Sequence, residues 1–192
     1  MKNRSVSWLC GAVLAVGAGL ASAAGGPGSA LPQAAANVVT PRVYVSLEPV
    51  PRGREFQIAV VAKIASEYHM NSHKPTDAYL IPTTLMATLP AGFELLDTIY
   101  PNGHLEKFVF SPDKPLDVYS GSVTVRLRVQ AKDDAALGAT TIPMTLRYQA
   151  CNQTTCLPPV KLPVEAKFVA AVAGTTARDV HPEIFAELRP LR

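Results

Sequence analysis

The sequence predicts an all-β protein, built as an antiparallel β-sandwich in a single domain, and three observations support this. Apolar and polar residues alternate with period two in several segments. No long segment shows the helical period, and prolines separate the alternating segments. Strands with one apolar and one polar face form sheets that bury one side. A small β-barrel would produce the same alternation.

The expected strands follow one another through most of the chain. The clearest are 123–130 and 141–149, where valine, leucine, isoleucine and methionine alternate with threonine, arginine and glutamine. The full set is 43–47, 56–64, 93–100, 105–110, 123–130, 141–149 and 160–169. Prolines between them suit turns and edge strands, as in an immunoglobulin-like sandwich.

The ends of the chain differ from this central region. Lys2 and Arg4, an apolar stretch and Ala21-Ser22-Ala23 predict a signal peptide over residues 1–23. Its apolar stretch is shorter than the roughly 20 residues of a membrane-spanning helix. We expect a flexible leader over 24–37, the domain over 38–172, and a tail over 173–192 with a short helix within 181–188.

Charge gives little information about partners. The chain has 18 Lys and Arg against 15 Asp and Glu, and without Lys2 and Arg4 the balance is 16 against 15. No basic cluster is visible, so nucleic-acid binding is not indicated. Acidic substrates are not implied either.

The chain has three cysteines, and the first, Cys10, lies in the apolar stretch and should leave with the signal peptide. Cys151 and Cys156 remain, separated by four polar, turn-compatible residues. We expect them to pair, with a Cα separation of roughly 5.5 Å. If the preceding strand keeps its register, Tyr148 faces the core while Gln149 and Cys151 face outward.

The role of this disulfide has two interpretations. A ring of about six residues stabilises a fold by roughly 2 kcal/mol, so local bracing is one reading and redox exchange the other. No Lys, Arg or His lies between Arg147 and Lys161, so the sequence gives no reason for a strongly lowered thiol pKa. In an exchange reaction we assign Cys151 as the attacked or attacking sulfur and Cys156 as the resolving one.

Two motifs give a resemblance. The run Tyr148-Gln149-Ala150-Cys151, followed by Cys156-Leu157-Pro158-Pro159, resembles the redox motif of the N-terminal periplasmic domain family of the thiol:disulfide interchange protein DsbD. The runs 70–75 and 79–83 are similar to a second stretch of that family, and the match extends over about 43–168.

The resemblance implies a periplasmic, immunoglobulin-like domain whose cysteine pair relays electrons. By motif position Cys151 and Cys156 inherit the redox role, in protein-disulfide reductase-like chemistry, with Tyr148 and Pro158 in support. The implied partners are thioredoxin-like or disulfide-isomerase-like periplasmic proteins, and a separate membrane electron transporter. No cofactor is implied.

Two features depart from the family pattern. The cysteine spacing is shorter than in the best-known member, and the chain ends at Arg192 without the membrane and thioredoxin-like domains, so we expect electrons to arrive from another protein. The family also covers its cysteines with a loop that bears an aromatic residue. The corresponding stretch here, 111–118, has none, although Phe110 and Tyr119 flank it.

Two other functions stay open. His69, Met70 and His73 could bind copper, with Cys151 and Cys156 as additional thiolate ligands when reduced. In an extended strand, however, His69 and His73 would lie about 13 Å apart, with Met70 facing the core. Alternatively, the domain is a non-catalytic adaptor with a structural disulfide. Signatures of hydrolases and phosphate-binding sites are lacking, and no metal ligand set is assigned.

Overall fold

The computed structural model describes residues 37–186. The expected signal peptide over 1–23, and all but the last residue of the expected leader over 24–37, lie outside this range. The same holds for the last part of the expected tail, residues 187–192. Within 37–186, no helix is both long and apolar enough to cross a membrane.

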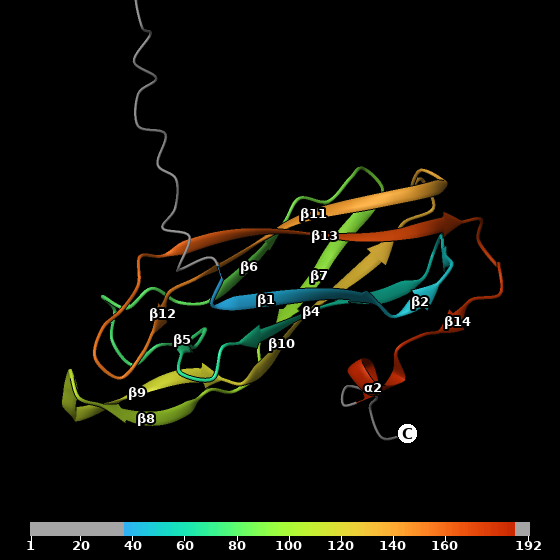
Figure 1. Ribbon diagram of the computed structural model, residues 1–192. Helices are drawn as coiled ribbons and strands as arrows, with labels where there is room; N and C mark the ends of the chain where they lie inside the picture. Colours follow the sequence, from blue (N-terminus) through green and yellow to red (C-terminus); the bar gives the residue numbers. More distant parts are fainter. Residues whose placement is uncertain (1–36, 187–192) are drawn as a thin grey trace, which may run out of the picture. The chain divides into compact units, whose positions relative to one another are not determined.

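Almost all regular secondary structure in the described region is β-strand, which confirms the all-β prediction (Figure 1). In chain order they are β1 (Val39–Val45), β2 (Leu47–Glu48), β3 (Val50–Pro51), β4 (Glu55–Ile64), β5 (His69–Asn71), β6 (Thr84–Ala87), β7 (Phe93–Ile99), β8 (His104–Phe108), β9 (Ser111–Ser120), β10 (Ser122–Ala131), β11 (Gly138–Tyr148), β12 (Ala150–Cys151), β13 (Val160–Ala171) and β14 (Arg178–Asp179). One short helix, α2 (Pro182–Phe185), follows β14.

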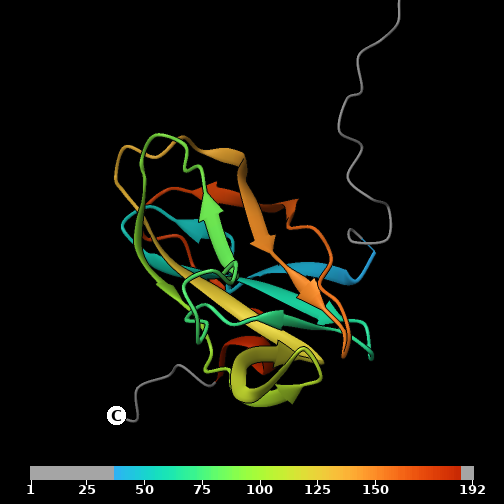
Figure 2. The same cartoon turned by 90° about the vertical axis from the view of Figure 1, so that its left-hand side faces the viewer.

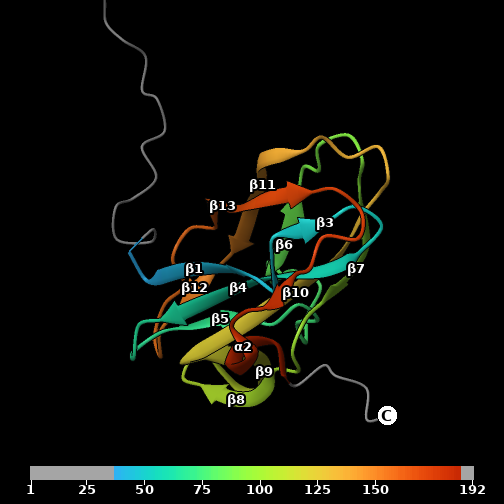
Figure 3. The same ribbon diagram turned by 90° about the vertical axis from the view of Figure 1, so that its right-hand side faces the viewer.

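Two four-stranded sheets form the sandwich, with strand orders β1-β4-β10-β7 and β3-β13-β11-β6. All pairings are antiparallel except that of β3 with β13, which is parallel. Figure 3 shows the two sheets as separate layers, with β11 and β13 in one and β4 and β10 in the other. The immunoglobulin-like antiparallel sandwich is therefore the observed fold class.

The core lies between these layers and follows the alternation of the sequence. On β10 every second residue from Val123 to Ala131 is buried, and on β11 the buried positions are Ile142, Met144, Leu146 and Tyr148. Phe56 of β4 packs against Phe168 of β13, with ring centroids 5.1 Å apart. A period-two pattern places these side chains on one face, so the sequence determines which face is buried.

A third sheet, ordered β12-β5-β9-β8, lies at one end of the sandwich. Figure 2 shows this end toward the viewer, with the β8–β9 hairpin in front. Strands β6 and β9 were not expected from the sequence. β9 contains Pro112 and Pro115, yet it pairs with both β5 and β8.

The segment after β13 lies at the end of the sandwich opposite the third sheet, where β14 pairs with β2 (Figure 1). The Arg126 guanidinium on β10 donates two hydrogen bonds to the Ile184 carbonyl, at 3.2 and 2.7 Å. These contacts hold α2 against the sheet. The helix covers residues 182–185 of the 181–188 segment in which one was expected, and residues 187 and 188 are not described.

Candidate functional site

Cys151 and Cys156 form a disulfide at the end of β12. Their Cα atoms are 3.9 Å apart, closer than the separation expected from the sequence, and the two residues form an isolated antiparallel bridge. The Leu157 N–H donates to the Ala150 carbonyl at 2.8 Å, which continues this pairing beyond the disulfide. The ring is therefore the tip of a very short hairpin.

Asn152 organises the turn between the cysteines. Its side-chain oxygen accepts hydrogen bonds from the backbone N–H groups of Thr154 and Thr155, at 3.0 and 2.9 Å. Its own N–H donates to the Thr155 carbonyl at 2.9 Å. Asparagine side chains commonly stabilise turns in this way. The turn therefore has its own hydrogen bonds in addition to the disulfide.

The two cysteines differ in exposure. Cys151 is 1% exposed, whereas Cys156 is exposed. The prediction that Cys151 faces outward is wrong, because β11 ends at Tyr148 and the chain then leaves its neighbour β13 to pair with β5. The alternation of β11 does not continue across that change of partner. Tyr148 does face the core as expected, and burial raises its pKa to about 12.

The other two residues of the motif lie beside the turn. Gln149 is half-buried, and its side-chain amide donates to the Leu157 carbonyl at 3.2 Å. Pro158 is exposed and lies outside any strand. The supporting role assigned to Pro158 stays a prediction.

His69 on β5 is the Cα partner of Cys151. It is 3% exposed, and its ring stacks on Phe108 with centroids 3.9 Å apart. Burial lowers the pKa of His69 to about 4; the Glu106 carboxylate raises this pKa and His104 lowers it. No sequence pattern connects His69 with Cys151, because the pairing joins segments far apart in the chain.

Aromatic side chains reach this end of the sandwich from the β8–β9 hairpin. Phe108 is 2% exposed, and Phe110 stacks on it with centroids 5.4 Å apart. The stretch 111–118, expected to correspond to the covering loop, instead forms most of β9. The aromatic residues therefore come from the positions just before that stretch.

A hydrogen bond joins the hairpin to the cysteine turn. The Gln153 side chain donates to Glu106 at 3.3 Å. A cavity of about 440 Å³ lies here, and its lining residues are Ser66, Glu67, Tyr68, His69, Glu106, Ser120, Asn152, Gln153 and Thr154. The turn, β5 with the loop before it, and the hairpin thus line one open cavity.

Of the candidate copper ligands, His69 lies opposite the disulfide-bonded Cys151, and the remaining histidine and the methionine lie elsewhere. His73 lies beyond β5, where its ring stacks on Tyr100 at 3.6 Å and its Nδ1 lies 3.0 Å from the Thr83 carbonyl oxygen. His69 stacks on Phe108 instead, and Met70 is fully buried in the core. Across residues 37–186, no group of three or more His, Cys, Asp or Glu side chains could hold a metal ion.

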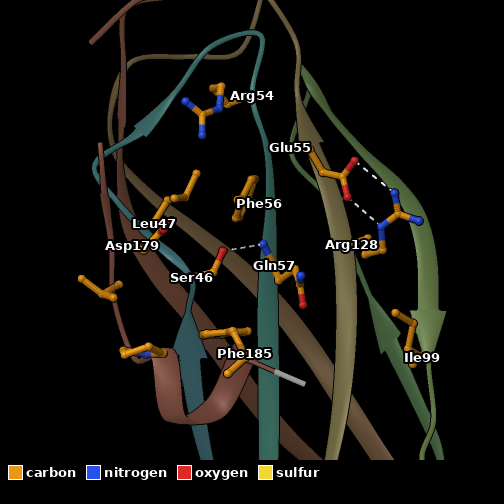
Figure 4. Close-up of a pocket in the computed structure, with 13 residues that line it drawn as sticks. Ser46, Leu47, Arg54, Glu55, Phe56, Gln57, Ile99, Arg128, Asp179 and Phe185 are labelled. Carbon is orange, nitrogen blue, oxygen red and sulfur yellow. Dashed lines mark hydrogen bonds and ion pairs between the residues drawn. The ribbon is translucent and has the colours of Figure 1, made fainter. Parts of the chain in front are cut away.

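A larger cleft, of about 670 Å³, lies at the α2 end of the sandwich (Figure 4). Its rim carries a bidentate ion pair between Arg128 and Glu55, with N–O distances of 2.6 and 3.1 Å. Phe185 of α2 closes one side. None of the residues predicted for the site lines this cleft.

Comparison with known proteins gives the family. The sequence matches the family described as thiol:disulfide interchange protein DsbD, N-terminal, over residues 35–166. The chain belongs to this family. No curated protein sequence matches the chain. Among solved structures, it is similar to the DsbD N-terminal domain of Neisseria meningitidis in the reduced form, with 18% identity, coverage of 74% of this chain and 90% of that one, and a TM-score of 0.41.

Proposed function

We propose that this DsbD N-terminal-like protein carries out thiol-disulfide exchange in the periplasm. The Cys151–Cys156 disulfide would relay electrons from a reduced donor to an oxidised periplasmic protein. One observation carries the proposal: an exposed cysteine, Cys156, is bonded to a buried one, Cys151, in a turn at the end of the sandwich. Family membership supports the same chemistry.

The position of the disulfide favours exchange over bracing. It joins residues five apart in sequence, within one turn, and does not link the two layers of the sandwich. The turn already has the hydrogen bonds of Asn152. A disulfide in such a place removes little conformational entropy from the unfolded chain, so it stabilises the fold only weakly. It is also accessible to an incoming thiolate.

Exposure also assigns the two sulfurs. A thiolate approaching from solvent reaches the exposed Cys156, so Cys156 forms the mixed disulfide and Cys151 leaves as the thiolate. When the reduced domain instead reduces an oxidised partner, Cys156 forms the mixed disulfide and Cys151 resolves it. This assignment reverses the one expected from the order of the cysteines in the sequence.

The partners would be thioredoxin-like or disulfide-isomerase-like periplasmic proteins, with a separate membrane electron transporter as the source of electrons. Exposed apolar side chains on the β8–β9 hairpin, which contacts the cysteine turn through Glu106, support contact with another protein. Leu105 and Val109 on the hairpin are 69% and 74% exposed, and Phe110 is 40% exposed. Exposed apolar residues grouped near a reactive site are typical of docking surfaces.

The test is a trapping experiment with a thioredoxin-like partner. A Cys151→Ala variant should accumulate a mixed disulfide through Cys156, because the resolving sulfur is gone. A Cys156→Ala variant should accumulate much less, and the double variant none. A wild-type reduction potential below about −300 mV without any trapped partner would mean a structural disulfide. Partner capture by the double variant at wild-type strength would mean a binding domain instead.

A further inference from the structure

The side chains of His69 and Cys151 project to the same face of the third sheet. In the antiparallel pair of β5 and β12, His69 is opposite Cys151 and Met70 is opposite Ala150. Directly opposed residues share a face, with Cβ atoms about 5 Å apart. Met70 and Ala150 belong to the main core, whereas His69 stacks on Phe108 of the hairpin. The imidazole and the buried cysteine therefore lie together on the hairpin side.

The Nε2 atom of His69 is buried and has no hydrogen-bond partner within the described region. Buried polar atoms are nearly always paired, so this nitrogen needs an explanation. The stack on Phe108, with an interplanar angle of 24°, restrains the ring. A disulfide sulfur carries no hydrogen to donate, but a thiol does. In the disulfide state Cys151 therefore has no proton to offer to this nitrogen.

We propose that His69 is the proton acceptor for Cys151. In the reduced protein the Cys151 S–H donates a hydrogen bond to Nε2, and the imidazole takes that proton when Cys151 attacks as the resolving sulfur. This inference rests on the proposed exchange function and identifies a residue that serves its second step.

The domain reduces an oxidised partner in two steps. The Cys156 thiolate attacks the disulfide of an oxidised partner, forms a mixed disulfide and releases the partner's first thiolate. The Cys151 S–H then passes its proton to His69, and the Cys151 sulfur attacks Sγ of Cys156. The Cys151–Cys156 bond forms, the bond from Cys156 to the partner breaks, and the departing thiolate takes up the proton. The partner gains two electrons and the domain loses two.

The surroundings keep the imidazole neutral, as an acceptor must be. Burial lowers the pKa of His69 to about 4; the carboxylate of Glu106 on β8 raises this pKa and His104 on the same strand lowers it. Glu67 and Tyr68 line the same cavity, and the remaining lining residues, Ser66, Ser120 and 152–154, are uncharged. Above about pH 5 the ring is therefore neutral and can accept the S–H hydrogen bond. Because a conjugate acid with a pKa near 4 makes it a weak base, it takes the proton only while Cys151 attacks and passes it on to the departing thiolate.

The experiment mixes the reduced protein with dithiobis(nitrobenzoate), a small coloured disulfide. Attack by Cys156 releases one coloured thiolate at a rate proportional to reagent concentration. Resolution by Cys151 releases a second at a rate independent of it. With His69 as proton acceptor, the second rate should be nearly constant between about pH 5.5 and 7.5, since the neutral imidazole is fully present there.

In His69→Phe only the thiolate of Cys151 can react, so the second rate should fall about tenfold per pH unit below the thiol pKa. At pH 6 we expect a loss on the order of 10- to 100-fold against wild type. A matched control is His104→Gln, an exposed histidine of β8, whose second rate should keep the wild-type pH profile.

A flat pH profile at the wild-type rate in His69→Phe would overturn the proposal. If that variant does not fold, His69→Gln takes its place. The glutamine amide accepts a hydrogen bond but takes up no proton, so the second rate should again fall steeply with decreasing pH. A second rate independent of pH in this variant would overturn the proposal in the same way. The first release tests the proposed function separately. If wild type shows no such release, exchange itself fails, independently of His69.

Discussion

The contribution of the disulfide to stability can be worked out from the size of the ring. Cys151 and Cys156 are five residues apart, and closing a loop of about six residues stabilises the folded state by about 2 kcal/mol in the chain-entropy description. The hydrogen bonds of Asn152 and the bond from Leu157 N–H to Ala150 involve no sulfur atom, so we expect them to remain after reduction. We therefore expect the reduced protein to stay folded, about 2 kcal/mol less stable than the oxidised one.

The assay is urea unfolding followed by far-ultraviolet circular dichroism, with and without dithiothreitol. The double variant Cys151→Ala, Cys156→Ala is the control, since the reductant should not alter its midpoint. A stability difference of about 2 kcal/mol between the oxidised and reduced protein also shifts the reduction potential. The potential of the disulfide in the folded protein should be about 40 mV more negative than that of the same disulfide in the unfolded chain.

A loss above about 4 kcal/mol on reduction, or the loss of a cooperative transition, would refute this reasoning. Either result would mean that the disulfide holds the third sheet in place. Differences of that size are found when a structural disulfide is removed from a small secreted domain.

Three further predictions concern the surroundings of the disulfide. The pKa of His69 in the folded protein lies below its ordinary value of 6.5, so the unfolded chain binds a proton at His69 more readily. The contribution of His69 to the free energy of unfolding is therefore complete above about pH 6.5, and about 3 kcal/mol of it is lost as the pH falls toward 4. Urea unfolding at both pH values should show a correspondingly smaller loss in His69→Phe, and an equal loss in both proteins would contradict the assignment. Phe108→Ala should lower the free energy of unfolding by about 3 kcal/mol in the same assay. Because the His69 imidazole becomes solvated in this variant, its pKa, followed by NMR, should rise toward 6.5. An unchanged pKa would mean that Phe108 does not bury the imidazole. Asn152→Ala should cost about 1 kcal/mol in both redox states, and a loss confined to one state would show that the turn is not held independently of the disulfide.

The sequence predicts best what depends on local alternation. Strands β10 and β11 were expected within a few residues of their observed bounds, because the period-two pattern of Val123 to Val129 alone determines which face is buried. β9 was missed for the opposite reason. Its prolines and charges are typical of a loop, and it becomes a strand through pairing with β5 and β8, which no local pattern encodes.

The candidate site divides in the same way. The cysteine pair and its polar turn are local features, and the motif around Tyr148 gave the family. The burial of Cys151 and the position of His69 depend on one long-range pairing, between β12 and β5. A histidine eighty-two positions before Cys151 could not be connected to it by spacing alone.

The pairing of β12 with β5 also determines which of the two sulfurs an incoming thiolate can reach. Had β11 continued in register, both sulfurs would meet solvent, and an incoming thiolate could attack either one. With Cys151 buried against β5 and Cys156 exposed, attack from solvent is confined to one sulfur. The second step is then intramolecular, because Cys151 is the one other cysteine within residues 37–186 and is already bonded to Cys156 in the oxidised state. A buried resolving thiol cannot lose its proton readily to water, since burial disfavours the thiolate. His69, opposite Cys151 on the neighbouring strand and neutral near pH 7, is the residue that we propose as the acceptor of this proton.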